Sequence, residues 1–543
     1  MASLAPYSQP LNPRLAGHLM RRVTLGPSQS EIQFATGQTP GQILASILVS
    51  DPPVNPPVDP ATGSSWVSPA PGPGNSMDDD LRGHFMAWWM ANVHRHPTSI
   101  FERMVWFWHN HFPTISSRVT NSAAIWYQHQ LFRKYALGNY KTLTRAICVD
   151  NAMLAHLDGK LNVAASPQEN FAREFFELFT VGKGAQVSPT DYTTFTENDV
   201  KEATRLLTGW DIDHTFSTVD TVTGIPRGKL KGNGQVATQH DTGTKNFGPA
   251  FNNTSITPAG NSKADAEAEL DAFIDMVFQS SHTAKYICRK LYRFFVYYDI
   301  TPEIEQDIIE PLAQQLMQAN YEIVPVLQTL LSSEHFYDVD DQISNNDNVG
   351  AIIKSPLEIT VGTLRSLEVA MPSESVDLNA FYGAYGNALT GFMDGQGLQL
   401  HEPYDVAGYD PFFQFPSFNR LWITPNYLAM RYKYGESIMA GVADVMGNLM
   451  FKLEPEQWIT NYCSNPSDPD QLVLEVCNFL VPIDLDQARR QEFRDQGLLD
   501  GITGAVWSAE WNSFAQGGTS TTVNTQLEKL FRRILQSPEY QIY

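Results

Sequence analysis

Residues 166–182 constrain the fold more than any other segment, because they combine the signals of a complete helix with several charges. Ser166 is placed to cap the N-terminus, Pro167 to take the first helical position, and Glu169 to close a capping box. Gly182 supplies a left-handed stop. The apolar face has helical spacing and consists of Phe171, Phe175, Phe176, Leu178 and Phe179. The segment therefore predicts an amphipathic helix that packs against other helices.

The charges of this segment admit two interpretations. Glu169, Arg173 and Glu177 stand four residues apart and Glu174 lies beside them, so that i, i+4 ion pairs are expected. The structural interpretation is a polar network that fixes helix packing, and it is the one the spacing favours. The functional interpretation makes one carboxylate, Glu174 or Glu177, a general acid or base with a raised pKa, next to Arg173. The Glu169 carboxylate is expected to bond to the N-cap amide in the capping box, and so to take no part in catalysis.

Helical periodicity runs through most of the chain, and it predicts a mostly α protein, a large multi-helix assembly. The chain has 543 residues with 42% apolar and only 18% charged residues, enough to bury a large core. We expect a single large helical domain over residues 1–543 with three irregular parts. These are a Pro/Gly-rich loop at 51–75, an irregular β and loop excursion at 211–259, and a long loop region at 373–424.

Charge and composition exclude several classes of protein. The net charge is -22, which makes a nucleic-acid backbone an unsuitable partner. No apolar stretch reaches about 18 residues, so no transmembrane segment is expected. Residues 1–13 lack the pattern of a signal peptide, so this chain gives no evidence of export, and its location stays open. The cysteines form no C-x-x-C pair: Cys148, Cys288, Cys463 and Cys477.

His109 and His111 flank Asn110 after an aromatic run and are candidate metal ligands. In an extended segment both rings would point to one side, and imidazole suits zinc, copper, nickel and iron. Carboxylates of residues 169–177, or the His240–Asp241 pair, would complete the site. A divalent metal is the one cofactor that the sequence suggests. The alternative is structural: the two rings cap helix carbonyls or bond to a buried glutamate.

A second group of chemistry-bearing residues lies in the irregular segment 211–259. His240, Asp241 and Lys245 stand close together there, and such residues on a loop indicate function more strongly than the same residues on a helix. The alternative is a solvated polar turn. The tryptophans of residues 88–108 line either a sugar-binding cleft or, as helical spacing favours, the core: Trp88, Trp89, Trp106 and Trp108.

Several segments together resemble a large bacterial family known as domain of unknown function 1800. They occur in the family's order and span nearly the whole chain: His18–Pro27, Trp108–Phe112, Gln168–Glu174, Thr196–Trp210, His240–Asp241 with Lys245, Lys354–Pro356, Gly395–Tyr409, Asn419–Ile423 and Ser537–Tyr540. The resemblance implies a mostly helical fold and no assigned activity. Many relatives look exported. At 402–409 this chain departs from the usual pattern, since Tyr409 replaces a tryptophan.

Two function hypotheses follow. The first is a metal-assisted hydrolase, whose site lies where the His109/His111 segment meets the charged helix and the His240 loop, with a glutamate as base. The second is a non-catalytic helical scaffold or surface-associated binding protein with a protein or carbohydrate partner. Motifs for serine hydrolases, P-loop enzymes, dinucleotide enzymes and HExxH metalloproteases are absent from the sequence.

Overall fold

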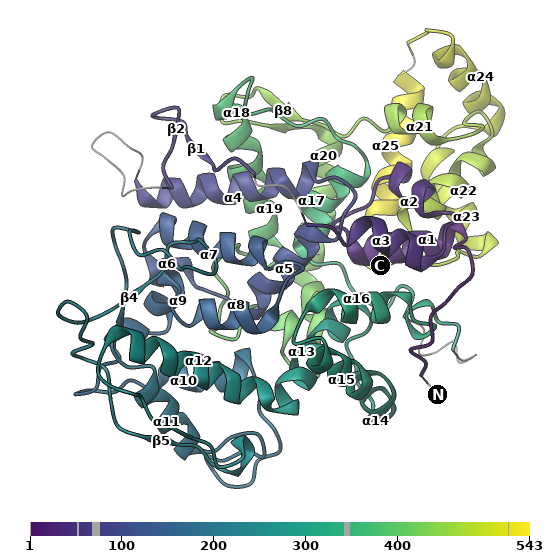
Figure 1. Cartoon of the computed structure of the whole chain (residues 1–543). Coiled ribbons are helices and arrows are strands. Elements are labelled where there is room, and N and C mark those ends of the chain that lie inside the picture. The colour runs from purple at the N-terminus through teal and green to yellow at the C-terminus, as the bar shows by residue number, and fades with distance from the viewer. Residues whose placement is uncertain (1, 51–53, 68–76, 341–347, 520) are drawn as a thin grey trace.

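The computed structural model describes residues 2–50, 54–67, 77–340, 348–519 and 521–543. Within these residues the protein is mostly α-helical with small two-stranded sheets, which confirms the predicted fold class. The central helices stack in near-parallel rows (Figure 1). From the top of that view the rows are α4 (Asp78–Arg95), then α7 (Ser122–Lys134) and α5 (Phe101–His111), then α8 (Tyr140–Ile147) and α12 (Lys263–Gln279).

The remaining helices cover this stack on several sides. Those before residue 340 are α1 (Pro13–Val23), α2 (Gln29–Ala35), α3 (Pro40–Ile47), α6 (Ser116–Val119), α9 (Asn151–His156), α10 (Asn170–Glu174), α11 (Glu197–Leu206), α13 (Ser281–Phe295), α14 (Pro302–Ile304), α15 (Glu310–Gln318) and α16 (Ile323–Ser332). Those after residue 348 are α17 (Pro356–Ser366), α18 (Leu378–Tyr382), α19 (Thr390–Gly395), α20 (Pro425–Ala440), α21 (Pro455–Tyr462), α22 (Pro469–Leu480), α23 (Gln487–Phe493), α24 (Gly504–Ala515) and α25 (Thr521–Leu535).

Capping boxes define where many of these helices begin. The side chain of the N-cap residue and that of the third helical residue exchange hydrogen bonds with the opposite backbone amides at α2, α3, α11, α12 and α17. The box of α11 joins Thr196 and Asp199, as its sequence predicts. Such boxes satisfy amides that a helix leaves unpaired at its start.

The strands are short antiparallel pairs in the connecting segments. They are β1 (Val58–Asp59) with β2 (Ser64–Ser65), β3 (Trp210–Asp211) with β4 (Lys229–Leu230), β5 (Lys245–Asn246) with β6 (Ser255–Ile256), and β7 (Val442–Ala443) with β8 (Leu449–Phe451). Two of the pairs lie in the 211–259 segment or at its edge. The 51–75 loop falls partly outside the described residues.

The 373–424 region differs from the expectation of a long loop. It contains α18, a π-helical stretch over Gly383–Leu389, α19, and 3-10 turns at Asp410–Phe412 and Phe418–Ile423. Its glycines and aromatic residues obscured the helical period. Gly386 packs its backbone against α4, where an added Cβ would lie 3.2 Å from the Cβ of Ala87.

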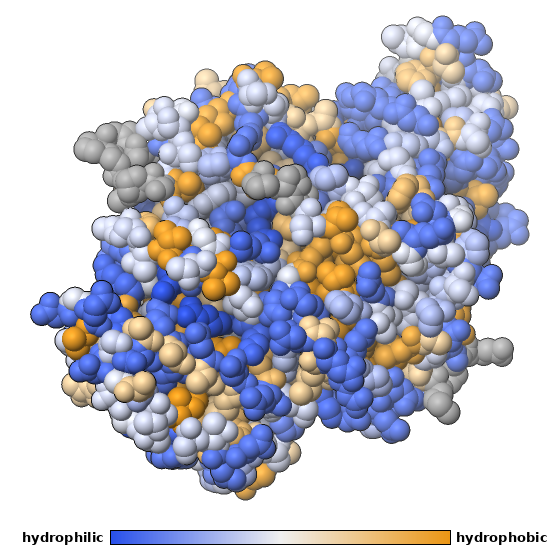
Figure 2. Space-filling view, in the orientation of Figure 1, coloured by the Kyte–Doolittle hydropathy of each residue, from blue (hydrophilic) through white to orange (hydrophobic). Residues whose placement is uncertain are grey.

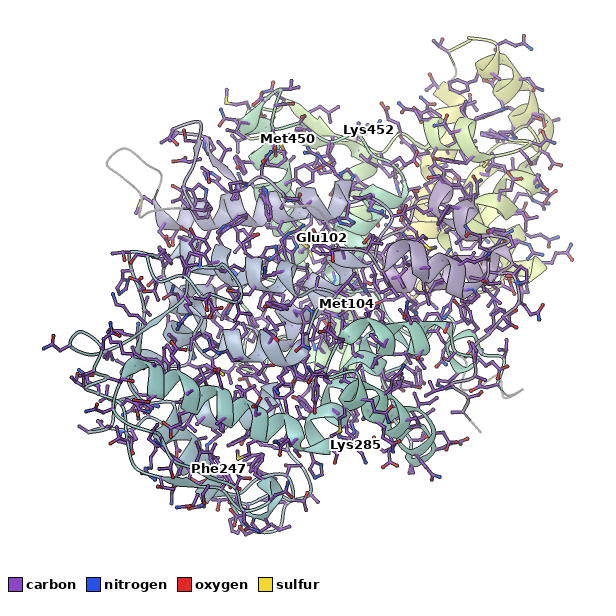
Figure 3. The ribbon with its side chains drawn as sticks, in the orientation of Figure 1. Glu102, Met104, Phe247, Lys285, Met450 and Lys452 are labelled. Atoms are coloured by element: carbon purple, nitrogen blue, oxygen red, sulfur yellow. The ribbon has the colours of Figure 1, made fainter. Side chains whose placement is uncertain are left out.

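Helix α5 lies at the centre of the molecule, and every one of its residues is buried. Glu102 of α5 forms a buried ion pair with Arg133 of α7 and accepts a hydrogen bond from the indole of Trp89 at 3.1 Å. Glu102 and Met104 lie in the middle of the view, while Lys285 and Lys452 lie nearer its outer parts (Figure 3). Trp88, Trp89, Trp106 and Trp108 are at most 5% exposed, so they belong to the core rather than to an open sugar-binding cleft.

The visible face of the molecule is mostly polar, in keeping with the net charge of -22 (Figure 2). An apolar patch interrupts it near the middle of the view, around the place where α3, α5 and α17 approach one another in Figure 1. Among the described residues no helix has both the length and the apolar character needed to cross a membrane.

Candidate functional site

The charged helix begins later than its sequence suggests. Helix α10 starts at Asn170, and its N-cap residue Glu169 makes no side-chain cap, so the predicted capping box of Ser166 and Glu169 is wrong. Ser166 instead closes a tight turn with Val163 through a backbone hydrogen bond of 2.9 Å. From Phe175 to Phe179 the helix continues as a π-helix. Turns of this kind are frequent at functional sites.

The π-helical turn changes which charges meet. Arg173 bonds to Glu169 at 3.1 Å, as expected, but its other partner is Glu197 of α11 at 3.0 Å. Glu177 pairs instead with Lys183 at 2.7 Å. The wider π-helical turn rotates residue 177 away from the position that an α-helix would give it, and the expected Arg173–Glu177 pair does not form.

Glu174 is the most perturbed of the predicted acid–base candidates. Burial, together with the neighbouring Glu177 carboxylate, raises the pKa of Glu174 to about 7. Lys183 and Arg173 act in the opposite direction but do not offset the burial. A carboxyl group with this pKa is able to exchange protons at neutral pH.

His109 and His111 point into different surroundings. Residues 101–111 are helical, so the extended segment assumed for the H-x-H pair is wrong, and positions two apart on a helix face different sides. The His109 ring packs against His401, with ring centroids 4.3 Å apart, and its Nε2 lies 3.4 Å from the hydroxyl of Tyr409. Among the described residues no group of three or more His, Cys, Asp or Glu side chains is arranged to hold a metal ion.

His240 and Lys245 meet at a residue that the sequence analysis did not single out, Glu269 of α12, and Asp241 Oδ1 lies 3.9 Å from Lys245 Nζ. The Glu269 carboxylate lies 2.6 Å from His240 Nε2 and 2.6 Å from Lys245 Nζ. The side chains of His240, Lys245 and Glu269 are at most 2% exposed. Asp241 binds Arg205 of α11 at 2.9 Å. The cluster ties the irregular segment to α11 and α12, and its burial favours a structural role.

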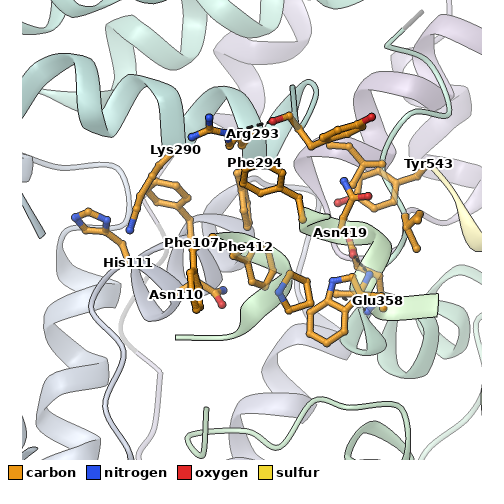
Figure 4. A pocket seen from close by; sticks show the side chains of 18 of the residues that line it. Phe107, Asn110, His111, Lys290, Arg293, Phe294, Glu358, Phe412, Asn419 and Tyr543 are labelled. Carbon is orange, nitrogen blue, oxygen red and sulfur yellow. Dashed lines mark hydrogen bonds between the residues drawn. The ribbon is translucent and has the colours of Figure 1, made fainter. Parts of the chain in front are cut away.

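The candidate functional site is a pocket beside α5 and α13. The space between its walls, counted together with the open solvent at its mouth, amounts to about 700 Å³. Its walls come from α5, α13, the start of α17, and residues 407–422 (Figure 4). Eight aromatic side chains line it: Phe107, Phe294, Tyr298, Phe412, Phe413, Phe418, Trp422 and Tyr543. A largely apolar pocket with a few convergent polar groups is the usual form of a small-molecule site.

The charges in the pocket wall are unbalanced. Lys290 and Arg293 of α13 line it, and among the described residues neither forms an ion pair. Lys290 Nζ donates to the carbonyl oxygen of Leu178 at 3.3 Å, and Arg293 Nε donates to the carbonyl oxygen of Tyr298 at 3.2 Å. The one carboxylate in the wall, Glu358, is bound by the buried Arg103. The pocket wall therefore contains two basic groups that have no ion-pair partner among the described residues.

Burial explains the acid–base state of these groups. It lowers the pKa of Lys290 to about 7, and the charge of Arg293 acts in the same direction. Burial also lowers the pKa of Arg293. For His111, burial holds the pKa well below its usual value, with Lys290 contributing, so this ring is neutral at pH 7. The site thus holds a guanidinium, an amine that titrates near neutrality, and a neutral imidazole.

Two buried polar atoms in the wall have no partner among the described residues. His111 Nε2 lies 3.2 Å from the carbonyl oxygen of Phe179, which assigns the proton to Nε2 and leaves Nδ1 with a free lone pair. The amide of Asn110 donates to the Trp106 carbonyl oxygen, while its own Oδ1 accepts nothing. Such atoms also occur elsewhere among the described residues, but these two lie in the wall of a pocket, where a ligand could bond to them.

Of the candidate catalytic and metal-ligating residues named from the sequence, only His111 lines this pocket. Lys290 and Arg293 were missed, although α13 carries a usable signal. Lys290 occupies the i+3 position of the stripe formed by Ile287 and Phe294, where an apolar residue is expected. A charged residue that interrupts the apolar stripe of a helix is a better indicator of a site than charge alone.

A family model described as "Protein of unknown function (DUF1800)" matches residues 18–542, nearly the whole chain. This agrees with the resemblance carried by the sequence segments. No curated protein matches the chain, and no solved structure does.

Proposed function

The chain belongs to the DUF1800 family of proteins of unknown function, and from its pocket we propose that it binds a small organic anion with an aromatic or aliphatic body. One observation carries the proposal: Lys290 and Arg293 face an aromatic-walled pocket and form no ion pair among the described residues. Of the two hypotheses drawn from the sequence, this proposal belongs to the second, a non-catalytic binding protein. It differs from that hypothesis in that the partner is a small molecule.

The balance of charge supports an anionic ligand. The chain as a whole carries -22, yet the charged side chains of the pocket wall are two cations and a glutamate already bound by Arg103. Withdrawing unpaired cations from water costs free energy unless a counter-charge compensates them. A carboxylate or phosphate group of a ligand supplies that counter-charge, and guanidinium groups bind both with good geometry.

The aromatic walls support an apolar body on the same ligand. Phe107, Phe294 and Phe412 come from three separate segments and face a common space (Figure 4). Burying aromatic or aliphatic carbon against them gains roughly 25 cal/mol per Å². Asn110 Oδ1 offers a hydrogen-bond acceptor that orients a donor group of the ligand.

Hydrolase activity is the second candidate, supported by the pKa of Glu174 near 7 beside Glu177. In that case Glu174 is the general base, with Arg173 and Glu177 beside it. A metal at His109 or His111 would need ligands beyond those that the described residues bring together. Glu174→Gln, with Glu169→Gln as control, tests this once a hydrolysed substrate is known: only the first variant should lose activity.

A thermal-shift screen tests the binding proposal without knowledge of the natural ligand. The panel pairs each small acid with a neutral amide and a cationic amidine of the same shape, such as benzoate, benzamide and benzamidine. We expect acids to raise the melting temperature and amidines to have no effect. Stabilisation by amidines in preference to acids, or by no acid in a broad panel, would contradict the proposal.

A further inference from the structure

We propose that Lys290 forms an imine with its ligand, so that the natural ligand is a small aldehyde or ketone that also carries a carboxylate or phosphate group. The inference rests on the proposed binding function and deepens it. It follows from where the Lys290 amine lies, which groups surround it, and which groups are absent.

The position of Lys290 separates it from ordinary surface lysines. It interrupts the apolar stripe of α13, and its only hydrogen-bond acceptor among the described residues is the Leu178 carbonyl oxygen. Lys285, one and a half turns earlier on the same helix, pairs with Glu310 at 2.5 Å. Lys290 has no such carboxylate partner among the described residues, and burial together with the charge of Arg293 disfavours its charged form.

The free amine is the form that attacks a carbonyl carbon. With a pKa near 7, a large fraction of Lys290 is unprotonated at neutral pH, whereas an ordinary lysine is almost fully charged. Lysines made nucleophilic in this way, by loss of hydration and a neighbouring cation, are the ones used for imine chemistry. Arg293 is that neighbouring cation here.

His111 is placed to handle the protons of this reaction. In Figure 4 the nitrogen end of Lys290 points toward the His111 ring, and Lys290 depresses the pKa of that ring. His111 Nδ1 carries a lone pair with no partner among the described residues. It can therefore accept a proton from the adding amine and return it to the departing hydroxyl group.

The step balances without any redox partner. The Lys290 nitrogen bonds to the carbonyl carbon, and a proton moves through His111 to give a carbinolamine. The hydroxyl group then leaves as water, taking the two hydrogens that the neutral amine carried, and a carbon–nitrogen double bond remains. Water reverses the step. Arg293 holds the anionic group of the ligand, and so fixes the carbonyl group near the amine.

Reductive trapping tests the inference. The protein is incubated at pH 7 with 4-carboxybenzaldehyde and cyanoborohydride, and the modified lysines are mapped by mass spectrometry. We expect the adduct at Lys290 to form at least about tenfold faster than at a lysine of ordinary pKa, because a pKa lower by more than one unit frees that much more amine. The rate at Lys290 should level off above about pH 7.

Two variants separate chemistry from folding. Lys290→Met keeps the aliphatic packing and should lose the fast adduct. Arg293→Gln should slow trapping of 4-carboxybenzaldehyde more than trapping of benzaldehyde, because benzaldehyde has no anionic group and is affected only through the Arg293 charge that lowers the pKa of Lys290. The fast adduct and this difference between the two aldehydes together support the inference.

Benzoate titration in parallel distinguishes the two ways of failing. If calorimetry detects benzoate binding but trapping is spread over surface lysines, or favours Lys354 of the neighbouring pocket, the imine inference is overturned and binding stands. If neither benzoate binding nor selective trapping occurs, both the imine inference and the proposed binding function are overturned.

Discussion

Lys290 lies one helical turn before Arg293 on α13, and both line one pocket without an ion pair among the described residues. Cations so close to each other repel, and this repulsion lowers the pKa of Lys290 further than burial alone. A stable protein tolerates such an arrangement at a cost in free energy, and sites that bind or react are where such costs are found.

Arg293→Gln should weaken binding of an aromatic acid by about 10- to 100-fold, because it removes a charge-assisted hydrogen bond worth roughly 1.5–3 kcal/mol. Calorimetry with benzoate measures this. The matched control is Arg289→Gln on the same helix. Arg289 does not line the pocket and pairs with Glu305 at 2.5 Å, so this variant should leave the affinity for benzoate unchanged. Equal losses in both variants would assign the effect to α13 as a whole.

Glu269→Gln should lower the free energy of unfolding by about 3–5 kcal/mol, since it leaves the buried Lys245 and His240 without their carboxylate. Urea denaturation measures the change. Glu267→Gln, on the same helix but 25% exposed, should cost about 1 kcal/mol. In the double variant with Lys245→Met the loss should be smaller than the sum of the single losses. If the loss in the double variant equals the sum of the two single losses, Glu269 and Lys245 do not stabilise each other.

The protein should lose stability as the pH falls below about 6.5. Burial lowers the pKa of His94 to about 4, of His156 to about 4 and of His401 to about 3. Between these values and about 6.5 the unfolded chain binds protons that the folded protein excludes, and each such histidine contributes up to about 1.4 kcal/mol per pH unit.

The variant His401→Asn isolates this effect at one position. His401 has a φ of 56°, a conformation that asparagine tolerates. The slope of unfolding free energy against pH should become shallower between about pH 4 and 6. An unaltered slope in His401→Asn would contradict a buried neutral imidazole.

Gly26→Ala should destabilise the protein by about 2–5 kcal/mol. Gly26 has a φ of 97°, and a Cβ there would lie 2.3 Å from the carbonyl oxygen of Gly362 in α17, so both backbone strain and overpacking oppose the change. Gly37 has a φ of 83° with nothing near its Cβ position. Gly37→Ala should therefore cost only about 1–2 kcal/mol of strain. Equal melting temperatures for the two variants would show that the close contact with α17 adds nothing to the cost of the substitution.

The helical fold could be predicted because its signals are local. The capping box of Thr196 and Asp199 and the apolar period of α12 depend on neighbours a few residues apart, and both helices form. The charged helix could not be predicted in detail. Its start at Asn170 and its π-helical turn depend on packing against other helices, so the sequence could not indicate that Arg173 would bind Glu197.

The site could be predicted only in part, because its members come from distant segments. His111 was singled out, but for a metal chelate that required an extended backbone, whereas α5 continues through that residue. Lys290 and Glu269 were both missed for one reason: each is a charged residue at a position where the period of a long amphipathic helix calls for an apolar one. A search for charged residues that interrupt an apolar helix stripe, instead of a search for clusters of charge, would have found Lys290 and Glu269.

A crystal soaked with 4-bromobenzoate tests the central claim most directly, because the anomalous signal of bromine locates the ligand. The account predicts bromine among Phe107, Phe294 and Phe412, with the carboxylate within hydrogen-bond distance of Arg293. Bromine bound elsewhere, with this pocket empty in crystals that hold the ligand, would contradict the proposal that the pocket binds organic anions.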